Sequence, residues 1–486
     1  MKTITAFGFS IILLLSCNKN NQGEDSTIKS VTSFINETKN ITVFGKIKTQ
    51  SILNKAEYQK IPKIGFILSS VINEFKNTVD LNNPIYYALE GPFDKNAMPN
   101  TIYAFIEINN SDSLIKNLTQ KGYDFNKTKN FDFTEIGKIS IGISNNLAII
   151  ITKKNKINSE KELAIIFDKT RKQSFEKENK IGKILKSNED IVIGVNYNSL
   201  YSTANTELNK LSIDKQNELN GITENSYSKL STSFNKGGLK LITENYISEK
   251  FKEILFLKDN NSTEQFMTKL GNGSPRMGLT LNLDLNKIEN FISKYTNTSF
   301  TKLAEEIGGP LQMAIMMGGE KPLSNLFSGE FGAIIIGEPK EDGTFVPDFN
   351  IYLGLGKKGK PLAEMAQSFL SNGTMKTIVD RKGISCYSSE KNMPLINSNL
   401  NLPDNLKDFG LKPISGFINL KDMDISSFEL SGGIKVLNIL ESIKFNMDNK
   451  KGEIIITSKD KSKNILKSSI DFYQKELETQ INKIGL

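Results

Sequence analysis

The same order of expected strands and helices occurs twice along this chain of 486 residues. Residues 42–48 alternate between apolar and polar side chains, which predicts a strand, and residues 51–58 follow with the spacing of a helix. Residues 276–285 alternate in the same way, and residues 286–294 again form an expected helix. A chain whose halves repeat one order of elements is expected to fold into two similar lobes.

The repeat continues through a hairpin, a helix and further strands in each half. These elements are expected at residues 84–90, 101–108, 111–121, 138–144 and 147–152, and again at residues 331–337, 345–355, 361–371, 375–380 and 383–388. Each half then has an alternating strand, at residues 191–197 and 414–420, followed by a second hairpin. The hairpin turns at residues 235–238 and 449–452 contain Asn and Gly, which tolerate a positive φ.

These elements predict an α+β fold of mainly antiparallel sheet with packed helices. The helices after the last hairpins are expected at residues 248–257 and 461–484. The first lobe is expected at residues 41–258, a linker rich in Asn, Gly and Ser at residues 259–275, and the second lobe at residues 276–486. A single long sheet shared by both halves is the alternative arrangement, and the sequence does not indicate an oligomeric state.

The first residues resemble a bacterial lipoprotein signal. Lys2 precedes an apolar run, and the run ends in Leu14-Leu15-Ser16-Cys17. That resemblance implies cleavage between Ser16 and Cys17 and attachment of lipid, with acyl chains of the palmitate type, to the Cys17 sulfur. The apolar run of about 12 residues is too short to span a membrane, which needs roughly 20. We therefore expect residues 1–16 to be a signal peptide and residues 17–40 a lipidated polar tether, with a short helix possible near residues 28–35.

The layout and the lipoprotein signal together resemble an uncharacterised family of Gram-negative cell-envelope lipoproteins, the domain of unknown function 4836. The stretches that carry the resemblance are Leu81-Asn82-Asn83-Pro84-Ile85-Tyr86-Tyr87 and Leu326-Phe327-Ser328-Gly329-Glu330-Phe331. The resemblance implies a fold and a location in the cell envelope, and it implies no catalytic residue. Because Asn18 and not Asp follows the lipidated cysteine, the outer membrane is the expected location, on its periplasmic face or at the cell surface.

Composition excludes several classes of function. The chain has no histidine, so a Ser-His or Cys-His catalytic pair and a histidine metal ligand are impossible. With Cys17 bound to lipid, Cys386 is the only thiol, and its alternating surroundings predict a small buried side chain. The formal charge of +8 comes from dispersed lysines, whereas only Arg171, Arg276 and Arg381 could fork onto phosphates, so nucleic-acid binding is not expected.

The sharpest motif is Gly354-Leu355-Gly356-Lys357-Lys358-Gly359, which matches the G-x-G-x-x-G pattern of dinucleotide sites, with Asp380 at the distance of a ribose-binding acid. The strand before it alternates, however, and is the return arm of a hairpin, whereas a dinucleotide site needs a buried parallel strand. Pro361 also moves the start of the next helix away from the loop. We therefore interpret the motif as a glycine-rich turn.

Other patterns have simpler structural explanations. They comprise three methionines (Met313, Met316 and Met317), three Ser-x-x-Lys patterns (at residues 113–116, 212–215 and 458–461), a calcium-like loop at residues 448–453, and the carboxylate pairs Glu305-Glu306 and Asp422 with Asp424. We expect core packing for the methionines, chance for the Ser-x-x-Lys patterns, a hairpin turn for the loop and solvated faces for the carboxylates.

The sequence thus predicts a non-enzymatic envelope lipoprotein that binds a protein partner or assists assembly at the outer membrane. No catalytic, cofactor-binding or metal-binding residue is assigned, and no cofactor is expected. Two alternatives stay open. One is a hydrolase that uses carboxylates or a Ser/Lys pair, and the other is a lipoprotein that captures a small molecule between its lobes.

Overall fold

The structure is a computed structural model that describes most of the chain from Gln22 to Ile484. Within that range it does not describe residues 63, 81, 155–157, 173–178, 204–210, 259–266, 296–311, 313–316, 320, 338–347, 371–374, 394–399 and 422–434.

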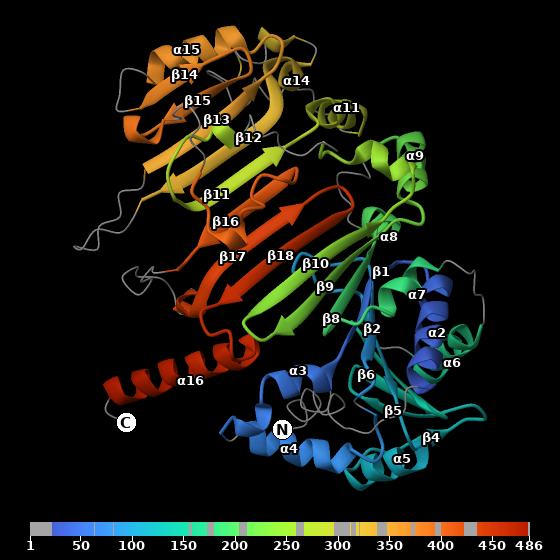
Figure 1. The fold of residues 1–486 in the computed structure, drawn as a ribbon. Helices are drawn as coiled ribbons and strands as arrows, with labels where there is room; N and C mark the ends of the chain where they lie inside the picture. The colour runs from blue at the N-terminus through green and yellow to red at the C-terminus, as the bar shows by residue number, and fades with distance from the viewer. Residues whose placement is uncertain are drawn as a thin grey trace. The chain divides into compact units, whose positions relative to one another are not determined.

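The chain separates into two compact units, and each combines antiparallel strands with helices (Figure 1). Unit 1 comprises Met1–Asn209, Asn217–Asn235 and Thr243–Ser248. Unit 2 comprises Lys210–Gln216, Lys236–Ile242 and Glu249–Leu486. The predicted α+β fold class is confirmed. Among the described residues, no helix combines the length and the hydrophobicity that crossing a bilayer requires.

The strands of unit 1 pair antiparallel in the order β4–β5–β6–β7–β3–β2–β1–β8–β9. Their bounds are β1 (Ile41–Ile47), β2 (Ile85–Glu90), β3 (Thr101–Glu107), β4 (Asn126–Lys127), β5 (Asp132–Ile136), β6 (Ile139–Ser144), β7 (Leu147–Lys153), β8 (Ile191–Asn196) and β9 (Tyr227–Asn235). Strand β10 (Gly238–Tyr246) contributes residues to both units.

Helices cover both faces of the unit 1 sheet. The described helices between Gln22 and β9 are α2 (Gln22–Glu37), α3 (Thr49–Lys55), η1 (Tyr58–Lys60), α4 (Ile64–Phe75), α5 (Ser111–Gln120), α6 (Ser159–Arg171), α7 (Lys180–Leu185), α8 (Tyr197–Thr203) and α9 (Ile213–Thr223), of which Ile213–Gln216 belongs to unit 2. Apolar residues of α2, α6 and α7 form one buried cluster with inward residues of the sheet, including Phe44 and Phe105. Residues of η1, α4 and α5 form a second cluster on the opposite face, with Ile106 and Ile141.

Helix α2 corrects the tether that the sequence predicts at residues 17–40. Ile28, Val31 and Phe34 are only 3%, 0% and 1% exposed, and the Phe34 ring packs 4.9 Å from the ring of Tyr103. Their spacing places them on one face of a helix, and burial of each such side chain contributes about 1.5–3 kcal/mol. The described part of residues 17–40 is therefore mostly folded core, and any tether is much shorter than expected.

The strands of unit 2 pair antiparallel in the order β14–β15–β13–β12–β11–β16–β17–β18. Their bounds are β11 (Pro275–Asn282), β12 (Phe327–Ile336), β13 (Asp348–Leu355), β14 (Lys376–Val379), β15 (Gly383–Tyr387), β16 (Ile414–Asn419), β17 (Leu440–Met447) and β18 (Lys451–Ser458). The described helices of this unit are η3 (Lys250–Ile254), α11 (Leu285–Tyr295), α14 (Pro322–Leu326), α15 (Lys360–Leu370), η4 (Glu390–Asn392), η5 (Asp404–Leu406), η7 (Lys435–Ile439) and α16 (Ile465–Ile484).

The two units repeat one strand order around a central strand. In unit 1, β1 lies between β2 and β8, and in unit 2, β11 lies between β12 and β16. Gly194 of β8 and Gly416 of β16 give each sheet room for an aromatic ring from a neighbouring strand, because a Cβ there would overlap the ring of Phe44 or Phe445. The order of elements predicted to occur twice is therefore present.

The helix predicted at residues 248–257 is wrong in type and length. Only the short 3-10 helix η3 forms there, and Phe251 is its buried residue. The chain after it is extended, since Leu257 bridges to Leu283 and the Lys258 N–H donates to the Asn282 carbonyl at 3.0 Å. This pairing with the end of β11 uses the backbone groups that a longer helix would need.

Candidate functional site

The predicted lipidation and cleavage residues, Ser16 and Cys17, lie outside the described residues. The same holds for Met313, Met316, the Glu305-Glu306 pair, and Asp422 with Asp424. Of the Ser-x-x-Lys patterns, Ser458 is buried and donates to the Ile439 carbonyl at 3.2 Å, whereas Lys461 pairs with Glu441 at 2.8 Å. These two side chains therefore have separate partners.

The space next to the glycine-rich loop at residues 354–359 is occupied by a neighbouring segment of the protein itself. A Cβ on Gly354, Gly356 or Gly359 would overlap residues 325–328. The Gly356 and Lys358 N–H groups donate to carbonyls of that segment at 2.9 and 2.8 Å, so they are not available to a phosphate. The preceding strand β13 pairs antiparallel with both of its neighbours. The loop is a tight turn, as its alternating strand predicts.

Asp380 of the dinucleotide-like pattern and Asp448 of the calcium-like loop each stabilise a hairpin turn. Asp380 accepts from the Lys382 and Gly383 N–H groups at 2.8 and 2.9 Å, and its other oxygen pairs with Lys269. Asp448 accepts from the Lys450 and Lys451 N–H groups, both at 2.8 Å. In each case the carboxylate satisfies backbone donors of a turn, which is the ordinary role of Asp in that position.

Cys386 lies in β15 and is 8% exposed, within a small cluster that includes Ile384 and Leu355. Burial raises the pKa of its thiol.

We expect Cys386 of the native protein to react with a disulfide reagent such as dithionitrobenzoate at least about 100-fold more slowly than Cys386 of the unfolded chain, because the thiolate is the reacting species. The absorbance change in native buffer and in guanidinium checks this; equally fast reaction in both would mean that β15 opens readily.

Ser187 and Lys229 form a serine–lysine pair that the sequence does not indicate, because the two residues are far apart along the chain. The Lys229 ammonium donates to the Ser187 hydroxyl at 3.1 Å and pairs with Glu244 at 2.5 Å. The Tyr246 hydroxyl donates to Glu244, and burial followed by the nearby Glu244 charge raises the Tyr246 pKa to about 12. The ion pair requires the ammonium form of Lys229, which has no lone pair to accept a proton from serine.

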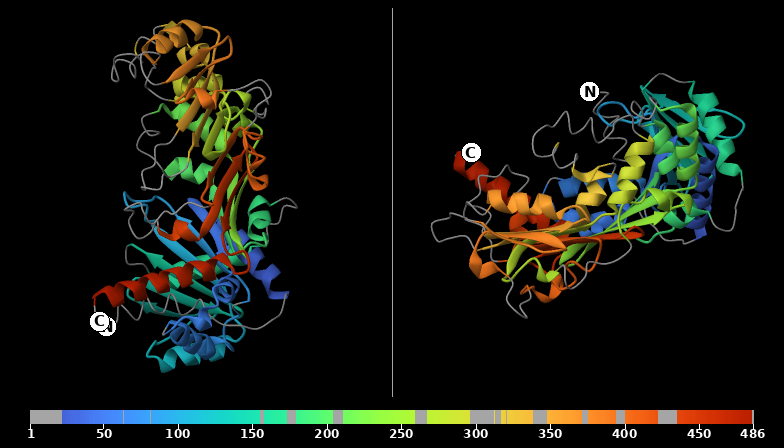
Figure 2. Two further views of the ribbon diagram at one scale, coloured as in Figure 1. Left: turned by 60° about the vertical axis from the view of Figure 1, so that its left-hand side comes forward. Right: turned by 90° about the horizontal axis from the view of Figure 1, so that it is seen from above.

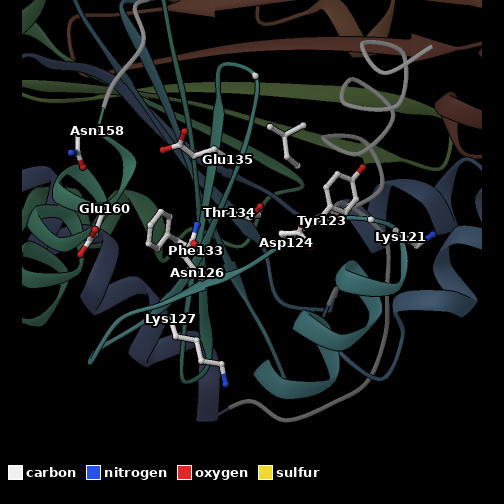
Figure 3. A pocket seen from close by; sticks show the side chains of 13 residues that line it. Lys121, Tyr123, Asp124, Asn126, Lys127, Phe133, Thr134, Glu135, Asn158 and Glu160 are labelled. Carbon is white, nitrogen blue, oxygen red and sulfur yellow. The ribbon is translucent and has the colours of Figure 1, made fainter.

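A broad, open pocket of about 1330 Å³ lies at the outer edge of β5 in unit 1 (Figure 3). Its walls are residues 121–127 after α5, residues 133–137 of β5 and its turn, and Asn158 and Glu160 at the start of α6. Strand β5 was not predicted from the sequence. The alternation of Phe131 and Phe133 with polar residues is the signal that could have revealed it.

The edge of β5 beside this pocket is only partly paired. Strand β4 pairs with it through Asn126↔Phe133 and Lys127↔Asp132. The Thr128 N–H donates to the Phe131 carbonyl at 3.0 Å, which shows that Phe131 and every second residue after it turn their backbone groups toward β4. The backbone N–H and C=O of Glu135 therefore point to the side that β4 would cover if it were longer.

Strand β4 diverges before it reaches that position. The register places Asp124 opposite Glu135, but among the described residues no backbone hydrogen bond joins the two. The pocket occupies the space between them, and it extends around both faces of β5 (Figure 3). Glu160 lies on the side of α6, and Tyr123 lies on the opposite side. The open space thus has the position of one further strand at the sheet edge.

The charges around the pocket are mixed, with a small acidic excess. Asp124, Glu135 and Glu160 contribute three carboxylates, and Lys121 and Lys127 contribute two ammonium groups. Lys121 is already paired with Glu74 at 2.6 Å. In the part of the chain that the structure describes, no three His, Cys, Asp or Glu side chains come together as metal ligands. The lining therefore favours a neutral or basic occupant.

No protein-family model matches the sequence, and a search of curated proteins found no significant match. Among solved structures, three crystal forms of the protein TP0453 are similar to parts of the chain. Form IV has 10% identity, covers 44% of this chain and 79% of that one, and has a TM-score of 0.27. Forms III and I have 9% and 10% identity, cover 74% and 73% of this chain and 94% and 90% of theirs, and have TM-scores of 0.22 and 0.19. At such low TM-scores the likeness does not establish a shared fold.

Proposed function

We propose that the chain is a lipid-anchored protein of the cell envelope, attached to the outer membrane through Cys17, with a non-enzymatic binding role. The lipoprotein signal at residues 14–17 supports the anchoring, and it also supports membership of the envelope lipoprotein family that the sequence resembles. The partner in this proposal is another envelope protein.

The observation that carries the binding role is the free edge of β5. An extended polypeptide that enters the pocket gains main-chain hydrogen bonds to Glu135, and its alternate side chains reach the two faces of the strand. The acidic excess from Asp124, Glu135 and Glu160 favours a segment that contains lysine or arginine. The bound segment would complete the edge that β4 leaves uncovered.

The test uses a proline in place of the one residue whose backbone N–H faces the open edge. Glu135→Pro removes that donor, whereas Glu135→Ala removes the same side chain and keeps the donor. Decapeptides selected on the wild-type chain from a random phage library serve as the probe. We expect them to bind Glu135→Pro at least about tenfold more weakly than Glu135→Ala, since a buried hydrogen bond contributes about 1 kcal/mol and register is lost as well.

Fluorescence polarisation with synthetic versions of the selected peptides measures both dissociation constants. Thermal melts of the two variants establish that each is folded, and proline is tolerated on edge strands where its nitrogen faces outward. Equal affinity for the two variants would show that the peptides bind elsewhere. A library that yields no binder would equally contradict a peptide-binding edge.

A further inference from the structure

Helix α4 exposes two large apolar side chains in its first turns. Phe66 is 80% exposed and Ile67 is 59% exposed, whereas Ile72 and Phe75 of the same helix are 7% and 1% exposed. The exposed positions further along, such as Asn73, are polar. The apolar surface is therefore confined to the N-terminal tip of the helix, which we call the α4 tip and define by Phe66 and Ile67.

The charges of residues 57–76, which include α4 and the turn before it, do not oppose contact with an anionic surface. The two carboxylates of this stretch are both ion-paired, Glu57 with Lys60 at 3.0 Å and Glu74 with Lys121 at 2.6 Å. Lys76 is exposed directly after the helix. Lys76 lies at the end of α4 opposite the tip, and exposed apolar side chains beside paired carboxylates are compatible with the interface of an anionic bilayer.

Helix α4 lies at the end of unit 1 where α2 begins (Figure 1). The Thr27 hydroxyl in the early part of α2 donates to Glu107, the last residue of β3, at 2.9 Å. The C-terminal end of α4 reaches the same place, because the Asp80 N–H donates to the Glu107 carbonyl and Val79 bridges to Ile108. The α4 tip is at the other end of this 12-residue helix, where η1 leads into it. Figure 1 and the left view of Figure 2 show α4 at the end of unit 1 where α3 follows β1.

The length of chain between Cys17 and α2 limits how far this end can lie from a membrane. Four residues lie between Cys17 and Gln22, where α2 begins, and the five fully extended steps from Cys17 to Gln22 span at most about 18 Å. Given the lipid on Cys17 that the proposed function assumes, the first residue of α2 lies within that distance of the lipid headgroups. A leash this short holds one end of unit 1 against the leaflet.

We propose that the α4 tip inserts into the same leaflet as the lipid on Cys17, as a second contact between unit 1 and the membrane. The inference rests on the lipidation in the proposed function and adds the surface that faces the bilayer. The lipid alone allows unit 1 to rotate about its leash. Insertion of Phe66 and Ile67 restricts this rotation, because two contacts leave unit 1 only the rotation about the axis that joins them.

A fluorophore that senses membrane depth tests the orientation. The full lipidated chain, with Cys386→Ala to remove the other thiol, carries NBD at Phe66→Cys and is reconstituted into phosphatidylethanolamine–phosphatidylglycerol vesicles. The matched control carries NBD at Ile165→Cys, because Ile165 is a 55% exposed apolar residue on α6 of the same unit. We expect lipids brominated in their acyl chains to quench the label at position 66 at least about threefold more than the label at position 165, since only buried labels meet the acyl region.

A second measurement separates this inference from the anchoring itself. The Cys17→Ser chain, which has no lipid, is floated with the same vesicles, and Phe66→Ser with Ile67→Ser is expected to lower the bound fraction at least about fivefold. Equal quenching at positions 66 and 165 in a lipidated chain overturns the α4 contact and leaves the anchoring intact. Energy transfer between α4 labels without vesicles would assign the tip to a second copy of the chain and also overturn it. Absence of lipid on Cys17 overturns the proposed function. If the Phe66→Ser and Ile67→Ser substitutions also leave the floated fraction of the Cys17→Ser chain unchanged, the inference about the α4 tip is overturned as well.

Discussion

Serine in place of Cys17 is expected to abolish attachment of lipid and release the protein from the membrane. Lipid transfer needs a sulfur nucleophile, and a serine hydroxyl at neutral pH is far less nucleophilic than a thiolate. Two or more acyl chains make anchoring stable, since each buried CH₂ contributes about 0.8 kcal/mol. Cells grown with radiolabelled palmitate should therefore show label in the wild-type chain and background only in Cys17→Ser.

Cys386→Ser is the matched control for this experiment, because it removes the other cysteine of the chain. It should keep full palmitate label and full recovery in the membrane fraction. A wild-type chain without label, or a Cys17→Ser chain that keeps it, would contradict the lipid anchor. A chain that is labelled but sediments with the inner membrane would contradict only the outer-membrane location.

Alanine in place of Asp190 is expected to destabilise unit 1 by about 2–4 kcal/mol. The Asp190 side chain is only 4% exposed and lies next to β8. It accepts from the Ser51 hydroxyl at 2.7 Å, from the Lys55 ammonium at 2.7 and 2.6 Å, and from the Phe234 N–H at 2.8 Å. These donors come from α3 and β9, so one carboxylate joins three elements and its loss leaves partly buried donors unsatisfied.

Hydrogen exchange read by mass spectrometry measures this effect on peptides from α3 and β9. Lys172→Ala is the control, because Lys172 is 61% exposed and its pair with Glu37 at 3.0 Å lies on the surface, where such a pair contributes about 0–1 kcal/mol. Cys386 reactivity reports on unit 2 and should be unchanged in both variants. Protection in Asp190→Ala equal to that in Lys172→Ala would show that the Asp190 contacts contribute little.

Much of the fold follows from local patterns. Alternating side chains locate β1, β11, β8 and β16 to within a few residues, because one face of each strand packs against the core. Helix α2 was predicted only in part, as a short helix near residues 28–35, although Ile28, Val31 and Ile35 have helical spacing. Asn, Gln, Gly and Ser around residues 18–26 resemble a linker in composition, and composition alone does not reveal whether a nearby apolar face finds a core to enter.

The candidate site is much harder to predict, because it depends on where two strands separate. The pocket exists because the chain before Asn126 does not pair with β5, and nothing in residues 121–127 indicates that divergence before the register is known. The Ser187–Lys229 pair is similar, because Ser187 follows α7 and Lys229 lies in β9, so packing of α7 against the sheet brings the two side chains together. The glycine-rich loop was interpreted correctly, since an alternating strand already argues against a parallel sheet.

The common strand order of the two units has a consequence for the number of peptides that one chain can bind at the β5 edge. In unit 1, residues 121–138 between α5 and β6 provide the hairpin of β4 and β5. In unit 2, only residues 371–375 separate α15 from β14, which occupies the corresponding place in the sheet, and that length is too short for a second such hairpin. A duplicated scaffold would suggest two equivalent sites, but the insertion is in one copy. Under the proposed function, the β5 site of one chain should therefore hold one peptide.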